Sequence, residues 1–340
     1  MTVRAAIFGC AGPELSNAEI AFFRDVRPWG FILFARNIVD PDQLRALNAS
    51  LRDSVGRADA PIFIDQEGGR VARMKPPFWR AAPPAARFGD LSLIDSEKGA
   101  RACYLNARLL AAELHAAGIN ANCAPLIDIA LPSAHAIIGD RAFAGSAALV
   151  AGLGAMMCRG LLEGGVLPVI KHIPGHGRAG ADSHLSLPVV DADLALLAQT
   201  DFVPFQKLAH MPLAMTAHIA YTAIDPDRPA TQSPRLIGDV IRDTIGFDGV
   251  LMSDDLGMAA LTGDFTARAR DSIAAGCDIV LHCSGDLDEM RAVARGTPEL
   301  AGAAARRCDR ALAQLRPPMA FDEAAARDAL HALLDMLEAG

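Results

Sequence analysis

The feature that most limits the folds open to this chain is a set of short apolar runs that recur at wide spacing. Each run is continuous, whereas a strand with one solvated face would alternate apolar and polar residues. The eight runs are residues 5–8, 30–35, 61–65, 119–129, 166–172, 213–219, 249–254 and 278–283. Such runs are typical of strands buried on both faces of a parallel sheet.

The segments between these runs have helical periodicity. In residues 100–118, apolar side chains recur every three or four positions and form one face. Further helices are expected near residues 16–26, 42–54, 146–163, 198–209, 233–244, 266–275 and 285–295. This alternation predicts an α/β fold, a single-domain (β/α)8 barrel of the TIM type. An open, doubly wound sheet is the alternative.

We expect the catalytic barrel to occupy residues 1–297 and a C-terminal helical extension of the same domain to occupy residues 298–340. The extension is rich in alanine and arginine, and its spacing predicts two helices packed outside the barrel. The proline-rich residues 74–90 are predicted to form a long, ordered loop over the barrel mouth.

Charge and composition limit the partners and the compartment. A net charge of −8, with acids and bases spread evenly, argues against nucleic acid or an anionic membrane as the main partner. No apolar stretch approaches the roughly 20 residues that span a bilayer. Seven cysteines without regular spacing indicate reduced, mostly buried thiols. The apolar run near the N-terminus is too short for a signal peptide. We therefore expect a cytoplasmic protein.

Polar and charged side chains gather where the apolar runs end, and this pattern favours the barrel. In a barrel these side chains would share the C-terminal mouth, where active sites are built. An open sheet would spread them along an edge. They are Arg36, Asn37, Asp65, Gln66, Glu67, Asp128, Lys171, His172, His218, Asp254 and Asp255.

The string LMSDDLGM (251–258) places two adjacent carboxylates after a buried run. A carboxylate at the end of a barrel strand can attack an anomeric carbon, because the transition state there resembles an oxocarbenium ion. A helix N-cap is the structural alternative for a strand-end aspartate. We assign the chemical role to Asp254 and the N-cap role to Asp255.

The string KHIPGHGRAGADSH (171–184) holds a lysine, three histidines and an aspartate in a glycine-rich loop. Asp182 and His184 are two residues apart, so the carboxylate can bond the imidazole, hold its tautomer and raise its basicity. A zinc site is the competing interpretation, with ligands His172, His176, Asp182 and His184. Against it, Lys171 would place a positive charge where the metal should bind.

Two further strings supply groups that suit sugar hydroxyls. IDQEGGRVARM (64–74) carries carboxylates and arginines around two glycines, and IGDRAF (138–143) adds Arg141. Such groups form bidentate hydrogen bonds with vicinal hydroxyls, although a salt-bridge network within the loop would use the same residues. His218 ends another run and fits either a buried structural histidine or a ligand contact.

Taken together, these strings resemble glycoside hydrolase family 3, and in particular its single-domain bacterial β-N-acetylglucosaminidases of peptidoglycan recycling. The matching segments run in order through the chain. They are GFILFARN (30–37), IDQEGGRVARM (64–74), APLIDI (124–129), IGDRAF (138–143), KHIPGHG with ADSHLSLP (171–188), AMTAHIAYTAIDPDRPATQSPRLI (214–237) and GFDGVLMSDDLGM (246–258).

The resemblance implies that Asp254 is the nucleophile, that His184 is the general acid/base and that Asp182 orients His184. It also implies that the sugar is bound by Asp65, Arg73, Arg141, Lys171 and His172. No metal or other cofactor is implied, and His176 receives no role. Gly257 stands where the family often has serine.

The activity implied is that of a retaining exo-β-N-acetylglucosaminidase acting through a covalent glycosyl-enzyme. The expected partner is a small sugar, a muropeptide fragment in which N-acetylglucosamine is linked to 1,6-anhydro-N-acetylmuramic acid with or without peptide. We expect the enzyme to be a monomer. The alternatives are a β-glucosidase or phosphorolytic enzyme of the same family, a metal-dependent amidohydrolase, and a catalytically idle sugar-binding module.

Overall fold

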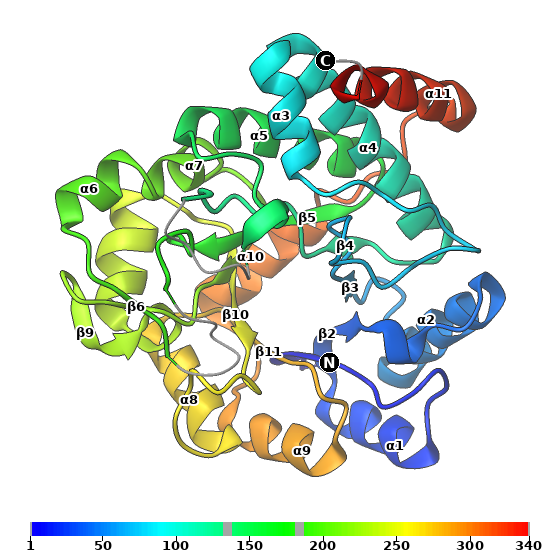
Figure 1. The fold of residues 1–340 in the computed structure, drawn as a ribbon. Coiled ribbons are helices and arrows are strands. Elements are labelled where there is room, and N and C mark those ends of the chain that lie inside the picture. The colour runs from blue at the N-terminus through cyan, green and yellow to red at the C-terminus, as the bar shows by residue number, and fades with distance from the viewer. Residues whose placement is uncertain (1, 132–137, 181–186, 339–340) are drawn as a thin grey trace.

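The protein is described by a computed structural model that covers residues 2–131, 138–180 and 187–338. Eight parallel strands close into a barrel and follow one another around it in sequence order (Figure 1). This confirms the (β/α)8 barrel and rejects the open sheet. The strands are β1 (Arg4–Phe8), β2 (Pro28–Leu33), β3 (Ile62–Ile64), β4 (Ala121–Asn122), β5 (Leu167–Ile173), β7 (Leu213–Thr216), β10 (Val250–Asp255) and β11 (Ile279–His282).

Most of the outer helices lie where the periodicity predicts them. They are α1 (Asn17–Val26), α2 (Pro41–Val55), α4 (Ser96–Ala116), α5 (Ala147–Glu163), α8 (Phe265–Ala275) and α9 (Leu287–Gly296). At the N-termini of all of these helices except α5, a side chain accepts backbone N–H groups that have no partner within the helix. Ser16, for example, forms a reciprocal capping box with Glu19, and Asp264 caps α8.

Two of the predicted helices differ in the structure. The segment predicted as one helix over 198–209 is two helices, α6 (Leu194–Gln199) and α7 (Phe202–Lys207). Between α6 and α7, the buried side chain of Asp201 pairs with Arg178 at 2.6 Å. A single continuous helix would have passed through this position. The segment predicted over 233–244 is wound as a π-helix, η4 (Leu236–Thr244).

Other short elements were not predicted. Helix α3 (Ala86–Ile94) begins inside the segment 74–90, which was expected to be loop throughout. A small second sheet joins β6 (Val189–Val190), β8 (Ala220–Tyr221) and β9 (Asp225–Pro229). Single-turn 3-10 segments are η1 (Ala35–Asn37), η2 (Gly139–Arg141), η3 (Ala230–Gln232) and η5 (Asp335–Leu337).

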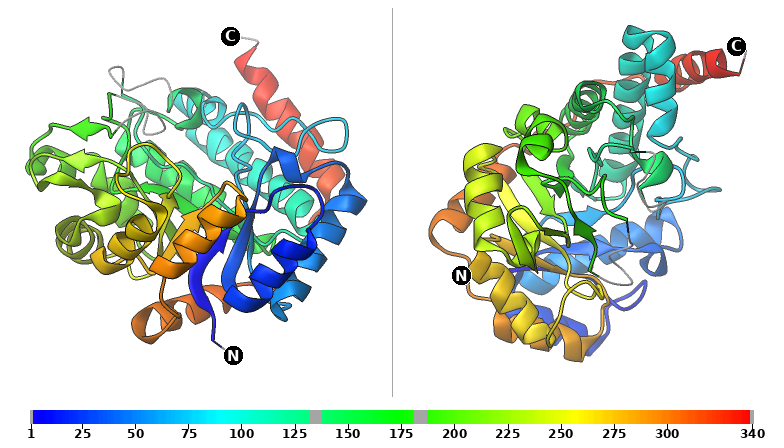
Figure 2. Two further views of the ribbon diagram at one scale, coloured as in Figure 1. Left: turned by 90° about the horizontal axis from the view of Figure 1, so that it is seen from below. Right: turned by 60° about the vertical axis from the view of Figure 1, so that its left-hand side comes forward.

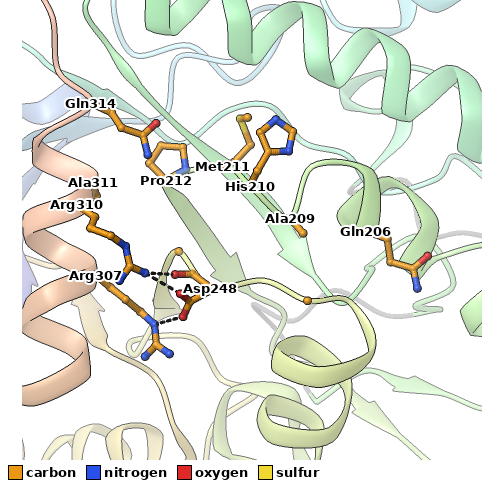
Figure 3. Close-up of a pocket in the computed structure, with 12 residues that line it drawn as sticks. Gln206, Ala209, His210, Met211, Pro212, Asp248, Arg307, Arg310, Ala311 and Gln314 are labelled. Atoms are coloured by element: carbon orange, nitrogen blue, oxygen red, sulfur yellow. Dashed lines mark hydrogen bonds and ion pairs between the residues drawn. The ribbon is translucent and has the colours of Figure 1, made fainter.

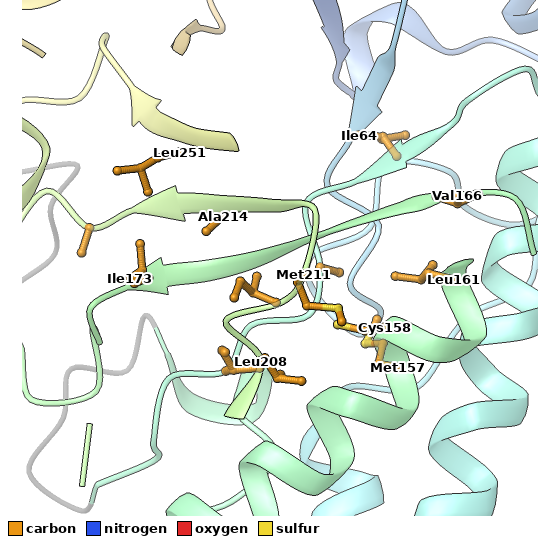
Figure 4. Packing of buried hydrophobic residues seen from close by; sticks show 14 of the residues in the cluster. Ile64, Met157, Cys158, Leu161, Val166, Ile173, Leu208, Met211, Ala214 and Leu251 are labelled. Carbon is orange, nitrogen blue, oxygen red and sulfur yellow. The ribbon is translucent and has the colours of Figure 1, made fainter. Parts of the chain in front are cut away.

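Apolar side chains pack on both faces of the barrel wall. Alternate residues of each strand point inward and fill the barrel with a cluster that includes Trp29 and Phe63. The outward residues meet the surrounding helices, and Figure 4 shows Ala214 and Leu251 on neighbouring strands, with Leu161 on the helix side. A strand buried on both faces explains why the apolar runs are continuous.

The C-terminal segment contributes α10 (Gly302–Leu312) and α11 (Glu323–Leu334). Helix α10 crosses the end of the barrel where the strands begin; it lies behind the barrel in Figure 1 and at the same end as the N-terminus in the left view of Figure 2. Its Cys308 and Ala311 belong to the cluster that fills the barrel interior. Helix α11 instead packs against α4. The two predicted helices are therefore present, and one of them closes the barrel.

Helix α10 is anchored by ion pairs to the loop before β10 (Figure 3). Arg307 pairs with Asp248 at 2.9 Å and with the buried Asp278 at 3.0 Å, and Arg310 pairs with Asp248 at 2.8 Å. An open cavity of about 460 Å³ lies beside these arginines. Among the described residues, no helix has the length and apolar character needed to cross a membrane.

Candidate active site

A second cavity, of about 220 Å³, lies at the opposite end of the barrel, where the strands finish. Six of the eight predicted site residues line it, although they are far apart in the sequence. They are Asp65, Arg73, Arg141, Lys171, His172 and Asp254. The other two, Asp182 and His184, lie in residues 181–186, outside the described part of the chain.

Asp254 is placed by β10, the strand that ends at Asp255. Its Oδ1 accepts the backbone N–H of Asp255 at 2.8 Å, and its Oδ2 lies 4.0 Å from Nε2 of His172. Burial alone would raise the pKa of this carboxyl, but the imidazoles of His172 and His218, the N–H of Asp255 and the charge of Lys171 together hold the pKa below its usual value. Asp254 is therefore an ionised carboxylate in the cavity wall.

Asp255 does not cap a helix, so that prediction is wrong. The next helix, α8, begins at Phe265 and has its own cap in Asp264. Instead, Oδ1 of Asp255 accepts the backbone N–H groups of Gly257 and Cys283, each at 3.0 Å. The carboxylate thus ties the turn after β10 to the end of β11, and its role is structural.

Lys171 is the centre of a buried network of charges. Its Nζ lies 2.9 Å from Oδ1 of Asp65 and 2.6 Å from Oε1 of Glu67. Arg141 donates two hydrogen bonds to Glu67, at 2.8 and 2.9 Å, in the bidentate geometry that suits a guanidinium. Arg73 donates to Asp65 at 3.2 Å. Strands β3 and β5 therefore bring opposite charges together across the barrel mouth.

The network fixes the protonation of its members. Burial would raise the pKa of both carboxyls, but Lys171 and the arginines reverse that effect. The pKa of Glu67 falls to about 2 and that of Asp65 also falls, while the two carboxylates raise the pKa of Lys171 above its usual value. Neither carboxyl of the network can act as a proton donor near neutral pH.

His172 is held by a carboxylate that sequence analysis did not assign to the site. Oδ2 of the buried Asp128 lies 2.8 Å from Nδ1 of His172. The same carboxylate accepts the backbone N–H of His172 at 3.2 Å and that of His176 at 2.6 Å. Because Nδ1 faces Asp128, the other ring nitrogen of His172 is the one directed toward Asp254.

His218 and Arg70 have structural partners. Nδ1 of His218 lies 2.6 Å from Oγ1 of Thr231, and its Nε2 lies 3.0 Å from the carbonyl oxygen of Asp255. Of the two interpretations open for His218, the structure favours the buried structural histidine. Arg70 pairs with Asp140 at 2.9 Å.

Sequence patterns provide only a weak signal for Asp128 and Glu67. Both follow apolar runs, but nothing in their spacing shows that Asp128 meets His172 or that Glu67 meets Arg141. Within residues 2–131, 138–180 and 187–338, no group of three His, Cys, Asp or Glu side chains is arranged to hold a metal ion. Two of the four zinc ligands considered, Asp182 and His184, lie outside those residues.

Comparison with known proteins decides the family. Residues 19–311 match the glycosyl hydrolase family 3 N-terminal domain. The chain belongs to glycoside hydrolase family 3. It is therefore a glycoside hydrolase, and the amidohydrolase alternative is rejected.

Relatives of this family 3 enzyme match it over most of their length. A β-hexosaminidase of Alkalilimnicola ehrlichii is 39% identical over 306 residues, which are 88% of this chain and 86% of that protein. A β-hexosaminidase of Methylobacillus flagellatus is 38% identical over 288 residues, 84% of this chain and 81% of that protein. The crystal structure of NagZ from Neisseria gonorrhoeae superposes with a TM-score of 0.88 at 31% identity and covers 98% of both chains.

Proposed function

We propose that this enzyme is a retaining exo-β-N-acetylglucosaminidase. The observation that carries the proposal is the state of Asp254, an ionised carboxylate in the wall of the cavity. Its Oδ2 accepts no hydrogen bond from the described residues, so a lone pair is available for attack on an anomeric carbon. The β-hexosaminidase names of its relatives support an N-acetylhexosamine as the sugar.

In the first step, Oδ2 of Asp254 forms a bond to C1 of the sugar while the bond from C1 to the glycosidic oxygen breaks. His184 protonates that oxygen, and the aglycone departs as an alcohol. In the second step, His184 takes a proton from water, the water oxygen attacks C1, and the ester bond to Asp254 breaks. Two inversions at C1 restore the original anomeric configuration.

The charge network supports the choice of a histidine as the acid. Retaining glycosidases generally use a second carboxyl group for this purpose. Here Asp65 and Glu67 are held ionised by cations, and Nδ1 of His172 is engaged by Asp128. His184, held in one tautomer by Asp182, would supply the proton instead.

The size of the cavity supports removal of a single terminal sugar. Its volume of about 220 Å³ is below the roughly 300–1,000 Å³ of pockets that enclose drug-sized ligands. One sugar ring would occupy it, with hydroxyls bound by Asp65, Arg73, Arg141, Lys171 and His172. These charged groups suit vicinal hydroxyls because they form paired hydrogen bonds.

The proposed natural substrate is a muropeptide fragment, N-acetylglucosamine linked β-1,4 to 1,6-anhydro-N-acetylmuramic acid with or without peptide. The resemblance of its motifs to the single-domain β-N-acetylglucosaminidases of peptidoglycan recycling supports this choice. We propose that the enzyme acts as a cytoplasmic monomer in peptidoglycan recycling, and that residues 298–340 fold as part of the same domain as residues 1–297.

The proposal is tested by trapping the intermediate with a 2-acetamido-5-fluoro glycosyl fluoride and mapping the labelled peptide by mass. We expect the label on Asp254, and proton NMR should show the β-anomer of N-acetylglucosamine as the first product. A label on another residue, or the α-anomer formed first, would contradict it. Assays of glucosides and of added phosphate separate the β-glucosidase and phosphorolytic alternatives.

A further inference from the structure

His176 is a polar side chain in the cavity wall that the proposed mechanism does not use. It lies in the loop after β5 and lines the same cavity as Asp254 and His172. Its side chain is largely enclosed, with 5% of the residue exposed. The ring packs edge-on against that of His172, with 5.4 Å between ring centroids.

The two ring nitrogens of His176 have different surroundings. Nδ1 is enclosed and has no hydrogen-bond partner among the described residues, whereas Nε2 is not enclosed in this way. An enclosed N–H without an acceptor carries its full desolvation penalty, and such groups are rare in native proteins. The proton is therefore expected on Nε2, on the open side of the ring.

The ring of His176 is neutral near neutral pH. Burial and the neighbouring imidazole of His172 lower its pKa to about 4, although the carboxylates of Asp128 and Asp254 act in the opposite direction. A neutral ring donates one hydrogen bond from its N–H, and a pKa of about 4 makes it a weak base near neutral pH. It suits an uncharged oxygen, such as a hydroxyl or an amide carbonyl, better than an anion.

The position of His176 is fixed from several sides. Its backbone N–H donates to Oδ1 of Asp128 at 2.6 Å. The carbonyl oxygen of Gly175 accepts a hydrogen bond from the hydroxyl of Tyr221, also at 2.6 Å. A Cβ atom at Gly177 would lie only 2.1 Å from the carbonyl oxygen of Ile129, so the loop packs too closely there for any side chain. A donor held this firmly is pre-organised for a ligand.

We propose that His176 is a further substrate-contacting residue, whose Nε2–H donates a hydrogen bond to one uncharged oxygen of the sugar bound beside Asp254. This inference rests on the proposed function, because that function places a sugar in the cavity. It assigns two histidines of the 171–184 string, His172 and His176, to binding of the sugar, and the third, His184, to the proton transfer.

The first test compares three substitutions on an aryl β-N-acetylglucosaminide. His176→Gln places an amide N–H near the position of Nε2, His176→Asn places it near Nδ1, and His176→Phe keeps a ring without a donor. We expect kcat/KM to fall about tenfold for the Asn and Phe variants, as for the loss of one neutral hydrogen bond, and to remain within about threefold for the Gln variant. His210→Phe, at an exposed histidine beside the far cavity, is the control and should change nothing.

The second test identifies the oxygen with aryl glycosides in which the 3-, 4- or 6-hydroxyl or the acetamido group is removed. The loss caused by His176→Phe should vanish with one of these substrates and persist with the others. Melting temperatures identify a variant that fails to fold, and binding of N-acetylglucosamine by calorimetry gives a second readout.

Equal losses with every substrate, or equal activity of the Asn and Gln variants, would overturn the inference. An active wild-type enzyme with an unaffected His176→Phe variant would also refute the role of His176 alone. A wild-type enzyme without activity on any N-acetylglucosaminide would instead refute the proposed function.

Discussion

Oδ2 of Asp128 lies 2.8 Å from Nδ1 of His172, so one buried carboxylate determines which nitrogen of that imidazole faces Asp254. Asp128→Asn replaces an acceptor by an amide that cannot accept from the ring and from both backbone N–H groups. We expect kcat/KM to fall about 10- to 100-fold, as for other partners that orient a histidine. Steady-state kinetics beside a circular dichroism melt checks this. An unchanged kcat/KM in a folded variant would contradict it.

Asp254→Asn should abolish turnover of an aryl β-N-acetylglucosaminide, with a loss of about three orders of magnitude or more. The amide keeps the size of the side chain but supplies no anionic nucleophile. Asp255→Asn is the matched control on the adjacent residue. Because Asp255 acts through the turn, we expect a lower melting temperature with a much smaller loss of activity. Comparable losses in both variants would argue against assigning the chemistry to Asp254.

His184→Ala should affect substrates according to their leaving groups. A nitrophenolate departs without a proton, whereas an alkyl alcohol or a sugar needs an acid. We expect a far larger loss of kcat/KM for the poor leaving group than for the good one. Parallel assays of an aryl glycoside and a disaccharide measure the difference. Equal losses on both would show that His184 has another task.

Glu67 links stability to pH. Its pKa is about 2 in the folded protein against a usual value of 4.5, so the folded state prefers the ionised form. The resulting stabilisation, on the order of 3 kcal/mol, is fully present above pH 4.5 and is lost as the pH falls toward 2.

Glu67→Gln should therefore lower the melting temperature near neutral pH and flatten its decline between about pH 5 and 3. Melts of both proteins across that range measure this. Parallel curves for the two proteins would contradict the expectation.

The two arginines of α10 provide a matched pair for stability. Arg307 is 20% exposed at its side chain and contacts the buried Asp278, whereas Arg310 is 55% exposed and pairs with an exposed carboxylate. Arg307→Met should lower the free energy of unfolding by about 1–3 kcal/mol, because Asp278 loses a partner. Arg310→Met should change it by about 0.5 kcal/mol or less. Denaturant unfolding measures the free energy of unfolding of both variants. Equal losses in the two variants would contradict the difference expected between Arg307 and Arg310.

The barrel was predictable because burial on both faces leaves a mark on every strand. The prediction of one helix over 198–209 was wrong because Asp201 turns inward and pairs with Arg178. Periodicity does not show a contact with a residue 23 positions away. The sheet formed by β6, β8 and β9 was missed because strands such as Val189–Val190 are too short to show a pattern.

The site was predictable as a set of strand ends but not as a set of contacts. Lys171 and Asp65 were both identified, yet nothing in their spacing shows that the lysine also reaches Glu67. Asp128 was noted as one carboxylate among several, and only the closed barrel brings it to His172. Pairings between distant strands depend on register around the barrel, which a single sequence does not display.

In the part of the chain that the structure describes, helix α10 and the side chains that fill the barrel close the end where the strands begin, so the cavity opens at the end where the strands finish. A disaccharide that enters with its terminal sugar foremost can leave only by the route it came. The aglycone, which lies nearer the entrance, must depart before the monosaccharide can, so the order of product release is imposed by the architecture. Free monosaccharide would then compete directly with incoming substrate, whereas free aglycone would bind to the loaded enzyme and drive the reaction backwards.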